Sequence, residues 1–169
     1  MCPAYLYQAP SGVEGDVTRV DESNVEPAFL ITPFPAKYGV AMKSATGGVT
    51  PIASGDSAAV FVGLLTRGAP GISQNSANEA IGAFQPNQSE VQNLMVRGYA
   101  SVKCTVGTPV RGQPVYVRIT ADTGKAVGDF ETGADSGKCV ALSATIVGNV
   151  TWAADGKDAF NNTEVRIAQ

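Results

Sequence analysis

The chain has 169 residues, the size of a single domain, and a domain of that size buries roughly 70% of the surface that its unfolded chain exposes. The formal net charge is −3, with no run of Lys and Arg, which excludes the basic surface that a nucleic-acid binder needs. No apolar run approaches the ~20 residues that cross a bilayer, so no membrane partner is expected either.

The N-terminal segment, residues 1–36, is richer in proline than the rest of the chain. Prolines at five positions interrupt any long regular element, and the first residues lack the layout of a signal peptide, which indicates a cytoplasmic site of synthesis. We expect an extended arm whose short apolar pieces, around Tyr5, Tyr7 and Phe29, dock on this subunit or on a neighbour. The alternative is an ordinary lead-in that folds over its own sheet.

The next strands are predicted from period-two patterns and apolar runs. Residues 38–42 alternate, a Gly-rich turn leads to residues 49–52, and residues 58–65 are apolar on both faces, which is typical of a strand packed between layers or at an interface. Residues 72–90 are polar and rich in Asn and Gln. We expect mostly loop there, with one or two helical turns that begin near Ser76.

The clearest pattern in the sequence covers residues 94–120. Apolar or small side chains occupy the even positions from Leu94 to Val106, which predicts a long half-buried strand. After a break at residues 107–109, the alternation resumes through residues 115–120, and we expect this second run to pair antiparallel with the first. In this interpretation Arg97 and Arg118 lie on the outward faces.

Short strands are also predicted at residues 126–130, 138–147, 150–153 and 163–167. The chain contains 19 Gly and 10 Pro, which punctuate strand after strand. This arrangement favours an all-β protein, a single-domain β-sandwich of the jelly-roll kind or a barrel, over any helical architecture. The predicted division is an arm over residues 1–36 and a β-body over residues 37–169.

Reactive side chains are scarce. The sequence has no histidine, which excludes Ser-His-Asp and Cys-His catalysis and the zinc sites that use histidine. Acids at positions 122, 129, 131 and 135 offer oxygen ligands for Ca²⁺ or a carboxylate pair for hydrolysis, but their spacing matches no EF-hand, and we interpret them as solvated turn residues. We expect no catalytic residue, no metal and no cofactor.

Two kinds of binding surface remain open at this point. Tyr99, Tyr116 and Trp152 are candidates for a sugar-stacking platform, although packing or subunit contact explains them as well. Arg97 and Arg118 are candidates for planar donors to the carboxylates of a partner protein, against the alternative of solvated arginines.

A succession of short motifs runs through the body of the chain. The motifs are Gly63-Leu64-Leu65-Thr66-Arg67, residues 96–102, residues 112–118, Gly124 to Phe130, and an Ala-Asp-Gly turn before Glu164-Val165-Arg166-Ile167. This succession resembles the structural cement proteins that decorate the heads of tailed bacteriophages. Their order and spacing agree with that family over roughly residues 36–169. The Pro-rich start and the Asn/Gln-rich segment have no counterpart in it.

This resemblance implies a non-enzymatic protein of the virion that binds the outer capsid surface and holds neighbouring major capsid proteins together. The implied partners are the major capsid protein and further copies of the chain, as a dimer or trimer on a capsid symmetry axis. A carbohydrate- or cell-surface-binding β-module is the alternative. The residues expected at an interface are Tyr5, Tyr7, Phe29, Phe34, Arg67, Arg97, Tyr99 and Arg118.

Overall fold

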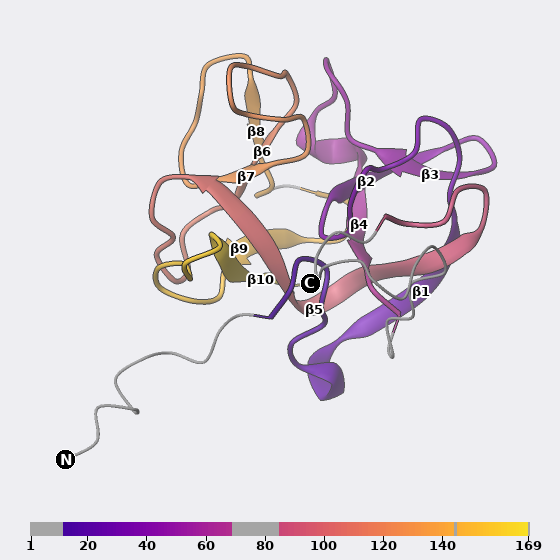
Figure 1. Ribbon diagram of the computed structural model, residues 1–169, viewed down its shortest axis with the longest axis horizontal. Helices are drawn as coiled ribbons and strands as arrows, with labels where there is room; N and C mark the ends of the chain where they lie inside the picture. The colour runs from indigo at the N-terminus through magenta and orange to yellow at the C-terminus, as the bar shows by residue number, and fades with distance from the viewer. Residues whose placement is uncertain (1–11, 69–84, 144, 169) are drawn as a thin grey trace.

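A computed structural model describes residues 12–68, 85–143 and 145–168 of the chain. Its regular elements are η2 (Val20–Glu22), β1 (Asn24–Phe29), β2 (Ala41–Ala45), β3 (Gly48–Pro51), η3 (Ala58–Val60), β4 (Phe61–Thr66), β5 (Val91–Val106), β6 (Tyr116–Arg118), β7 (Phe130–Glu131), β8 (Cys139–Ala141), β9 (Asn149–Trp152) and β10 (Asn162–Ala168). The strands form one mixed sheet (Figure 1), which confirms the all-β prediction.

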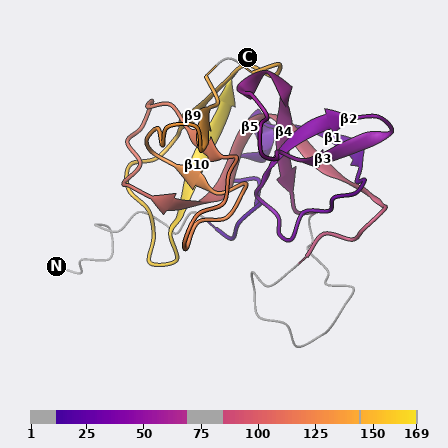
Figure 2. The ribbon, with the colours of Figure 1, turned by 90° about the horizontal axis from the view of Figure 1, so that it is seen from above.

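The long strand β5 joins the two halves of the molecule. Its first half pairs antiparallel with β1 and β4, whereas its second half pairs antiparallel with β10 and parallel with β7. Figure 2 shows β9 and β10 on one side of β5 and β2, β3 and β4 on the other. The strand was predicted correctly, and Leu94, Val96, Ala100, Val102 and Cys104 are buried as expected, but Ser101, at a position predicted to face outward, is buried too.

The sheet packs around two apolar cores. The larger core extends across both halves of the sheet, because it contains Trp152 of β9 and Phe130 of β7 together with Phe61 of β4. The smaller core includes Leu30 and Met42, both fully withdrawn from solvent. Since a buried aliphatic side chain stabilises a fold by about 1.5–3 kcal/mol, these cores account for much of what holds the sheet in its curved form.

Residues 12–36 lie against the rest of the protein. β1 pairs with the first half of β5. Leu30, directly after β1, forms a parallel bridge to Val49 in β3, so this segment connects the two outer strands of the row β3, β2, β4 and β5. Residues 12–36 therefore dock on the sheet of their own chain, which both interpretations of the N-terminal segment allow. Residues 1–11 lie outside the described residues, so an extended arm there stays a prediction. The helical turn predicted near Ser76 also lies outside the described residues and stays a prediction.

The predicted pairing between residues 94–106 and 115–120 is wrong. β7 lies between β5 and β6, and β6 pairs with β7 and β8. The segment that connects the two strands, residues 107–115, lies against the end of β9. The amide of Gly112 donates to the carbonyl of Trp152, and the amide of Trp152 donates to the carbonyl of Gln113. Alternation identified both strands, but a long connection leaves the choice of partner to tertiary contacts.

Candidate functional site

The described residues offer no candidate metal site. In residues 12–68, 85–143 and 145–168, no cluster of three or more His, Cys, Asp or Glu side chains could hold a metal ion. Across the same ranges, no helix is long and apolar enough to cross a membrane.

The prediction that Arg118 faces outward is wrong. Its side chain is fully buried, its Nε donates to Oε1 of Glu131 at 2.5 Å, and its Nη2 donates to Oδ2 of Asp135 at 2.8 Å. The loop before β8 folds over the second face of β6, so the polar side of this alternating strand is covered too. Arg118 stabilises the fold and is not available to a partner.

These contacts and burial shift the pKa values of Arg118 and of the groups around it. The hydrogen bond from Arg118 lowers the pKa of Asp135, and the hydrogen bond to Glu131 raises the pKa of Arg118. Burial raises the pKa of the nearby Cys139 thiol, which lies 3.4 Å from Oε2 of Glu131. This network links β6, β7, the loop before β8 and the start of β8, with Asp135 at its edge keeping 33% of its side chain exposed.

Arg67 and Phe34 also lie against the protein's own residues. The Nε of Arg67 donates to the backbone carbonyl of Glu14 at 2.7 Å, and its guanidinium carbon lies 5.3 Å from the centre of the Tyr38 ring. Phe34 is partly buried against the smaller core. Tyr5 and Tyr7 lie outside the described residues, and their role at an interface stays a prediction.

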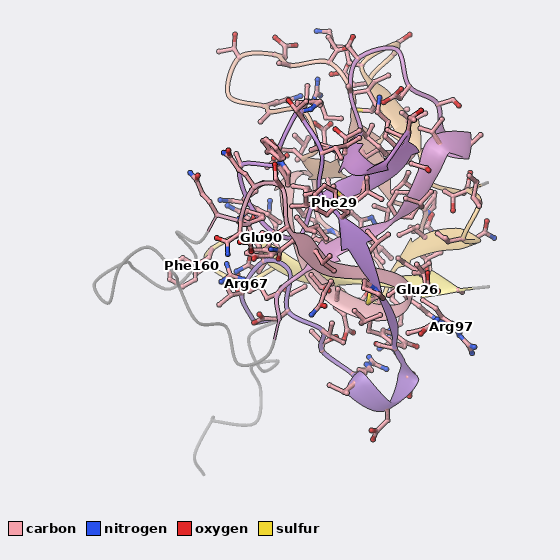
Figure 3. The ribbon with its side chains drawn as sticks, turned by 90° about the vertical axis from the view of Figure 1, so that its right-hand side faces the viewer. Glu26, Phe29, Arg67, Glu90, Arg97 and Phe160 are labelled. Carbon is pink, nitrogen blue, oxygen red and sulfur yellow. The ribbon has the colours of Figure 1, made fainter. Side chains whose placement is uncertain are left out.

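β1 is the most exposed strand of the sheet. Side chains on both of its faces are open to solvent, and of its six residues only Ala28 reaches even partial burial. Phe29 is 43% exposed and lies opposite Val91 of β5, which is 62% exposed. Figure 3 shows β1 in front of β5, with Glu26 and Phe29 labelled along it. Because strands normally bury at least one face, β1, which no described residue covers and which exposes apolar side chains, is a candidate interaction surface.

Tyr99 lies at the centre of a cluster of charged side chains. The guanidinium carbon of Arg19 is 3.9 Å from the centre of its ring, and that of Arg166, its cross-strand partner in β10, is 5.7 Å away. Arg19 is held in place by an ion pair of 2.8 Å with Glu164. Cation–π contacts of this kind orient the arginines on the surface of the ring.

A hollow of about 320 Å³ adjoins this cluster. Its walls include Arg97, Tyr99 and Arg166 on one side and Asp21 and Glu22 of η2 on the other. Arg97 is exposed and is seen at the edge of the molecule in Figure 3. Of the residues around the hollow, the sequence singled out Arg97 and Tyr99.

The remaining residues of the hollow were missed by the sequence analysis. Arg166 carried a usable signal, because it alternates with buried residues in the predicted closing strand. Asp21 and Glu22 carried none, since η2 follows no periodic pattern.

The structure does not bring together the predicted sugar-stacking rings. Trp152 is 1% exposed and belongs to the larger core. Tyr99 has a face covered by Arg19. A platform that stacks on sugar needs open ring faces, so these three aromatic residues do not form one.

Comparisons with known proteins identify the family. A model of the XM1 gp53 minor capsid protein family matches residues 2–167. The chain belongs to this family. A solved structure described as the capsid of Myoviridae phage XM1 contains a similar chain, with a TM-score of 0.66 and 17% sequence identity over 100% of this chain and 98% of that one. No curated protein matches.

Family membership places this minor capsid protein in the virion of a phage, as a structural component associated with capsid proteins. The structural similarity extends over the whole chain, and at this level of identity it describes the fold. The resemblance to phage head proteins found in the sequence is thus confirmed at the level of a capsid-associated protein.

Proposed function

We propose that this minor capsid protein binds the outer surface of the assembled head and cements neighbouring major capsid proteins, without catalytic activity. The observation that carries the proposal is the family match over residues 2–167. The surface that we assign to the shell is β1 with the adjoining start of β5, because its exposed apolar side chains have no cover within the described residues. Burying them against a capsid protein removes apolar area from water at about 25 cal/mol per Å².

The charge-poor composition supports the same role. Charged residues make up 16% of the chain, against about 25% in an average soluble protein, so less charge must be stripped of water when a neighbour covers the surface. Cementing also needs several contacts at once. Copies that associate as a dimer or trimer on a capsid symmetry axis gain about 10²- to 10⁴-fold in avidity, so weak individual contacts suffice.

The test uses heads produced without this protein. Purified protein is added to them, bound protein is measured by co-sedimentation, and the temperature at which heads release DNA is recorded. We expect saturable binding at a fixed ratio to the major capsid protein and a higher release temperature. Phe29→Asp should weaken binding at least tenfold, because it places a charge in the buried contact.

Phe160→Asp is the matched control. Phe160 is 77% exposed and lies in the turn between β9 and β10, outside β1. It should bind heads like the unaltered protein, and thermal unfolding of both variants verifies that they fold. Absence of binding by the unaltered protein, or bound protein without any change in release temperature, would contradict the cementing role.

A further inference from the structure

A second hollow, of about 660 Å³, lies beside the segment that leads into η2. Its lining includes three valines of that segment, Val13, Val17 and Val20, together with Thr66 at the end of β4 and Asn93 near the start of β5. We call it the valine hollow. Its volume is in the range of pockets that take up drug-sized ligands, so it can receive several side chains of a bound segment.

The valine hollow is apolar and electrically balanced. Val20 is 74% exposed, so part of its apolar wall is open to solvent. The charged side chains in the lining are Arg67 and Asp16, whose Nε and Oδ1 lie 3.9 Å apart, so their charges offset each other. Burying an unpaired charge is costly, so the hollow suits an occupant with apolar side chains and no charged one.

The start of the chain has this composition. Residues 1–11 contain no Asp, Glu, Lys or Arg, and the first charged side chain of the sequence is that of Glu14. The segment includes the run Tyr5-Leu6-Tyr7. Tyrosine combines a large apolar ring with a hydroxyl that bonds to polar groups, which suits a hollow lined by valines, a threonine and an asparagine. Eleven residues span at most ~40 Å, enough to reach a neighbouring copy.

The path of residues 12–18 favours a neighbouring copy over the same molecule. The amide of Thr18 donates to the carbonyl of Tyr99 in β5. Further back, the carbonyl of Gly12 accepts from the side-chain amide of Asn162, which lies opposite Lys103. Followed towards its start, the chain thus advances along β5 from residue 99 towards residue 103, whereas the hollow reaches β5 near residue 93 (Figure 1). A segment that enters its own hollow must therefore reverse its direction.

We infer that residues 1–11 of one copy occupy the valine hollow of a second copy, with Tyr5, Leu6 and Tyr7 as the anchoring side chains. Each copy supplies one segment and one hollow. The exchange therefore closes a dimer when it is reciprocal and a trimer when it passes around a ring. The inference deepens the proposed self-association and rests on that part of the proposed function.

The exchange is compatible with binding to the shell. The valine hollow borders the surface assigned to the shell through Val25, in β1, and Asn93. Phe29, which carries the proposed shell contact, lies four residues further along β1, about 13 Å away at 3.3 Å per residue. One copy can therefore hold a neighbour's segment and bind the shell at the same time, and separate variants test the two contacts.

Complementation between two variants tests the inference. One variant lacks residues 2–11 and keeps the hollow, and the other carries Val20→Asp, which places a charge in the wall of the hollow and keeps the segment. In sedimentation velocity each alone should be monomeric where the unaltered protein forms oligomers. Mixed together, they should form a complex of one copy of each, because the segment of the second variant enters the hollow of the first.

Ile146→Asp is the matched control. Ile146 is 69% exposed and does not line the valine hollow, so this variant should form oligomers like the unaltered protein. Thermal unfolding verifies that every variant is folded. Oligomers that survive the deletion of residues 2–11, or a mixture that stays monomeric, overturn the inference.

A fluorescent peptide with the sequence of residues 1–11 measures the contact directly. It should bind the shortened protein saturably, and at least tenfold more weakly when that protein also carries Val20→Asp. An unaltered protein that stays monomeric, although its shortened form binds the peptide, would assign the segment to its own hollow and so overturn the exchange. Absence of peptide binding overturns it as well.

Head binding is measured on the same samples, so the two proposals can fail independently. A monomeric protein that still binds heads and raises their release temperature removes the exchange and leaves the cementing role. Oligomers that follow the complementation rule but do not bind heads do the reverse.

Discussion

The side chains of Arg118 and Glu131 form an ion pair, with 2.5 Å between Nε and Oε1, in which neither residue has more than 1% of its surface exposed. Arg118 belongs to β6 and Glu131 to the neighbouring strand β7. A second carboxylate, that of Asp135, binds the same guanidinium from the loop before β8. Arg118 and its two carboxylate partners thus hold together β6, β7 and the loop before β8, where the strands have only two or three residues.

Replacing Arg118 with Met should destabilise the protein strongly. The change leaves the Glu131 carboxylate buried without a countercharge, and removing one partner of a buried pair costs about 3–5 kcal/mol. Urea unfolding at neutral pH measures the loss in the free energy of unfolding. Asp122→Asn is the control, because the ion pair between Asp122 and Lys138 is exposed and its loss should leave the unfolding midpoint unchanged. Equal effects of the two substitutions would contradict the assigned role of Arg118.

Asp135 should make the stability of the protein depend on pH in the acid range. The hydrogen bond from Arg118 lowers the pKa of Asp135 in the folded state below its ordinary value of 3.8. A carboxyl group with a lowered folded-state pKa stabilises the fold above its unfolded-state pKa, and this contribution disappears as pH falls through the folded-state value.

The comparison variant is Asp135→Asn, unfolded by urea between neutral pH and the pKa range of carboxylates. Its free energy of unfolding should lie below that of the unaltered protein at neutral pH, and the gap should narrow as the pH falls. A gap that is constant with pH would show that the charge of Asp135 contributes nothing.

The fold class was readable from the sequence because period two directly reports which side chains face the core. β5 and β10 were predicted nearly residue for residue, since both alternate between apolar and polar positions. β8 is shorter than predicted, and the strand predicted at residues 126–130 is wrong except at Phe130, because residues 126–129 form a turn and β7 begins at Phe130. Their partners are fixed by contacts between distant segments, and a pattern along one strand carries no information on which strand lies beside it.

The candidate surface was only partly predictable for a related reason. Arg97 and Arg118 occupy polar positions of alternating strands, yet Arg97 is exposed and Arg118 is buried. The difference comes from the loop that covers β6, which no local pattern reveals. Phe29 was identified from its short apolar run, but the sequence did not show that its strand would lie open on both faces.

Replacing Gly98 with Ala should disrupt the middle of β5. Gly98 has φ of +120°, and a Cβ built on it would lie 2.2 Å from Oγ and 2.5 Å from Cα of Ser23. Because the second contact involves backbone, a side-chain rotation cannot relieve it, and η2 must move away from β5. We expect a loss well above the ~1–2 kcal/mol that a positive φ alone costs an alanine.

Gly124→Ala separates the contact from the backbone strain. Gly124 has φ of +73° but no atom within 4 Å of an added Cβ. Urea unfolding should therefore show a clearly smaller loss than for Gly98→Ala. If both substitutions cost the same, the close approach of Ser23 to β5 contributes nothing to stability.

Replacing Leu30 with Ala should show that the segment before β2 is part of the folded body. Leu30 is 0% exposed in the smaller core, and its residue bridges β3 directly after β1 ends. Truncating a buried leucine costs about 2.7–5 kcal/mol, from lost burial and from the cavity left behind. Val110→Ala, at a position that is 52% exposed, should stay within about 0.5 kcal/mol of the unaltered protein in the same urea titration. A Leu30→Ala variant as stable as Val110→Ala would mean that residues 24–30 form no part of the cooperative unit, because a strand that unfolds separately cannot lower the stability of the rest.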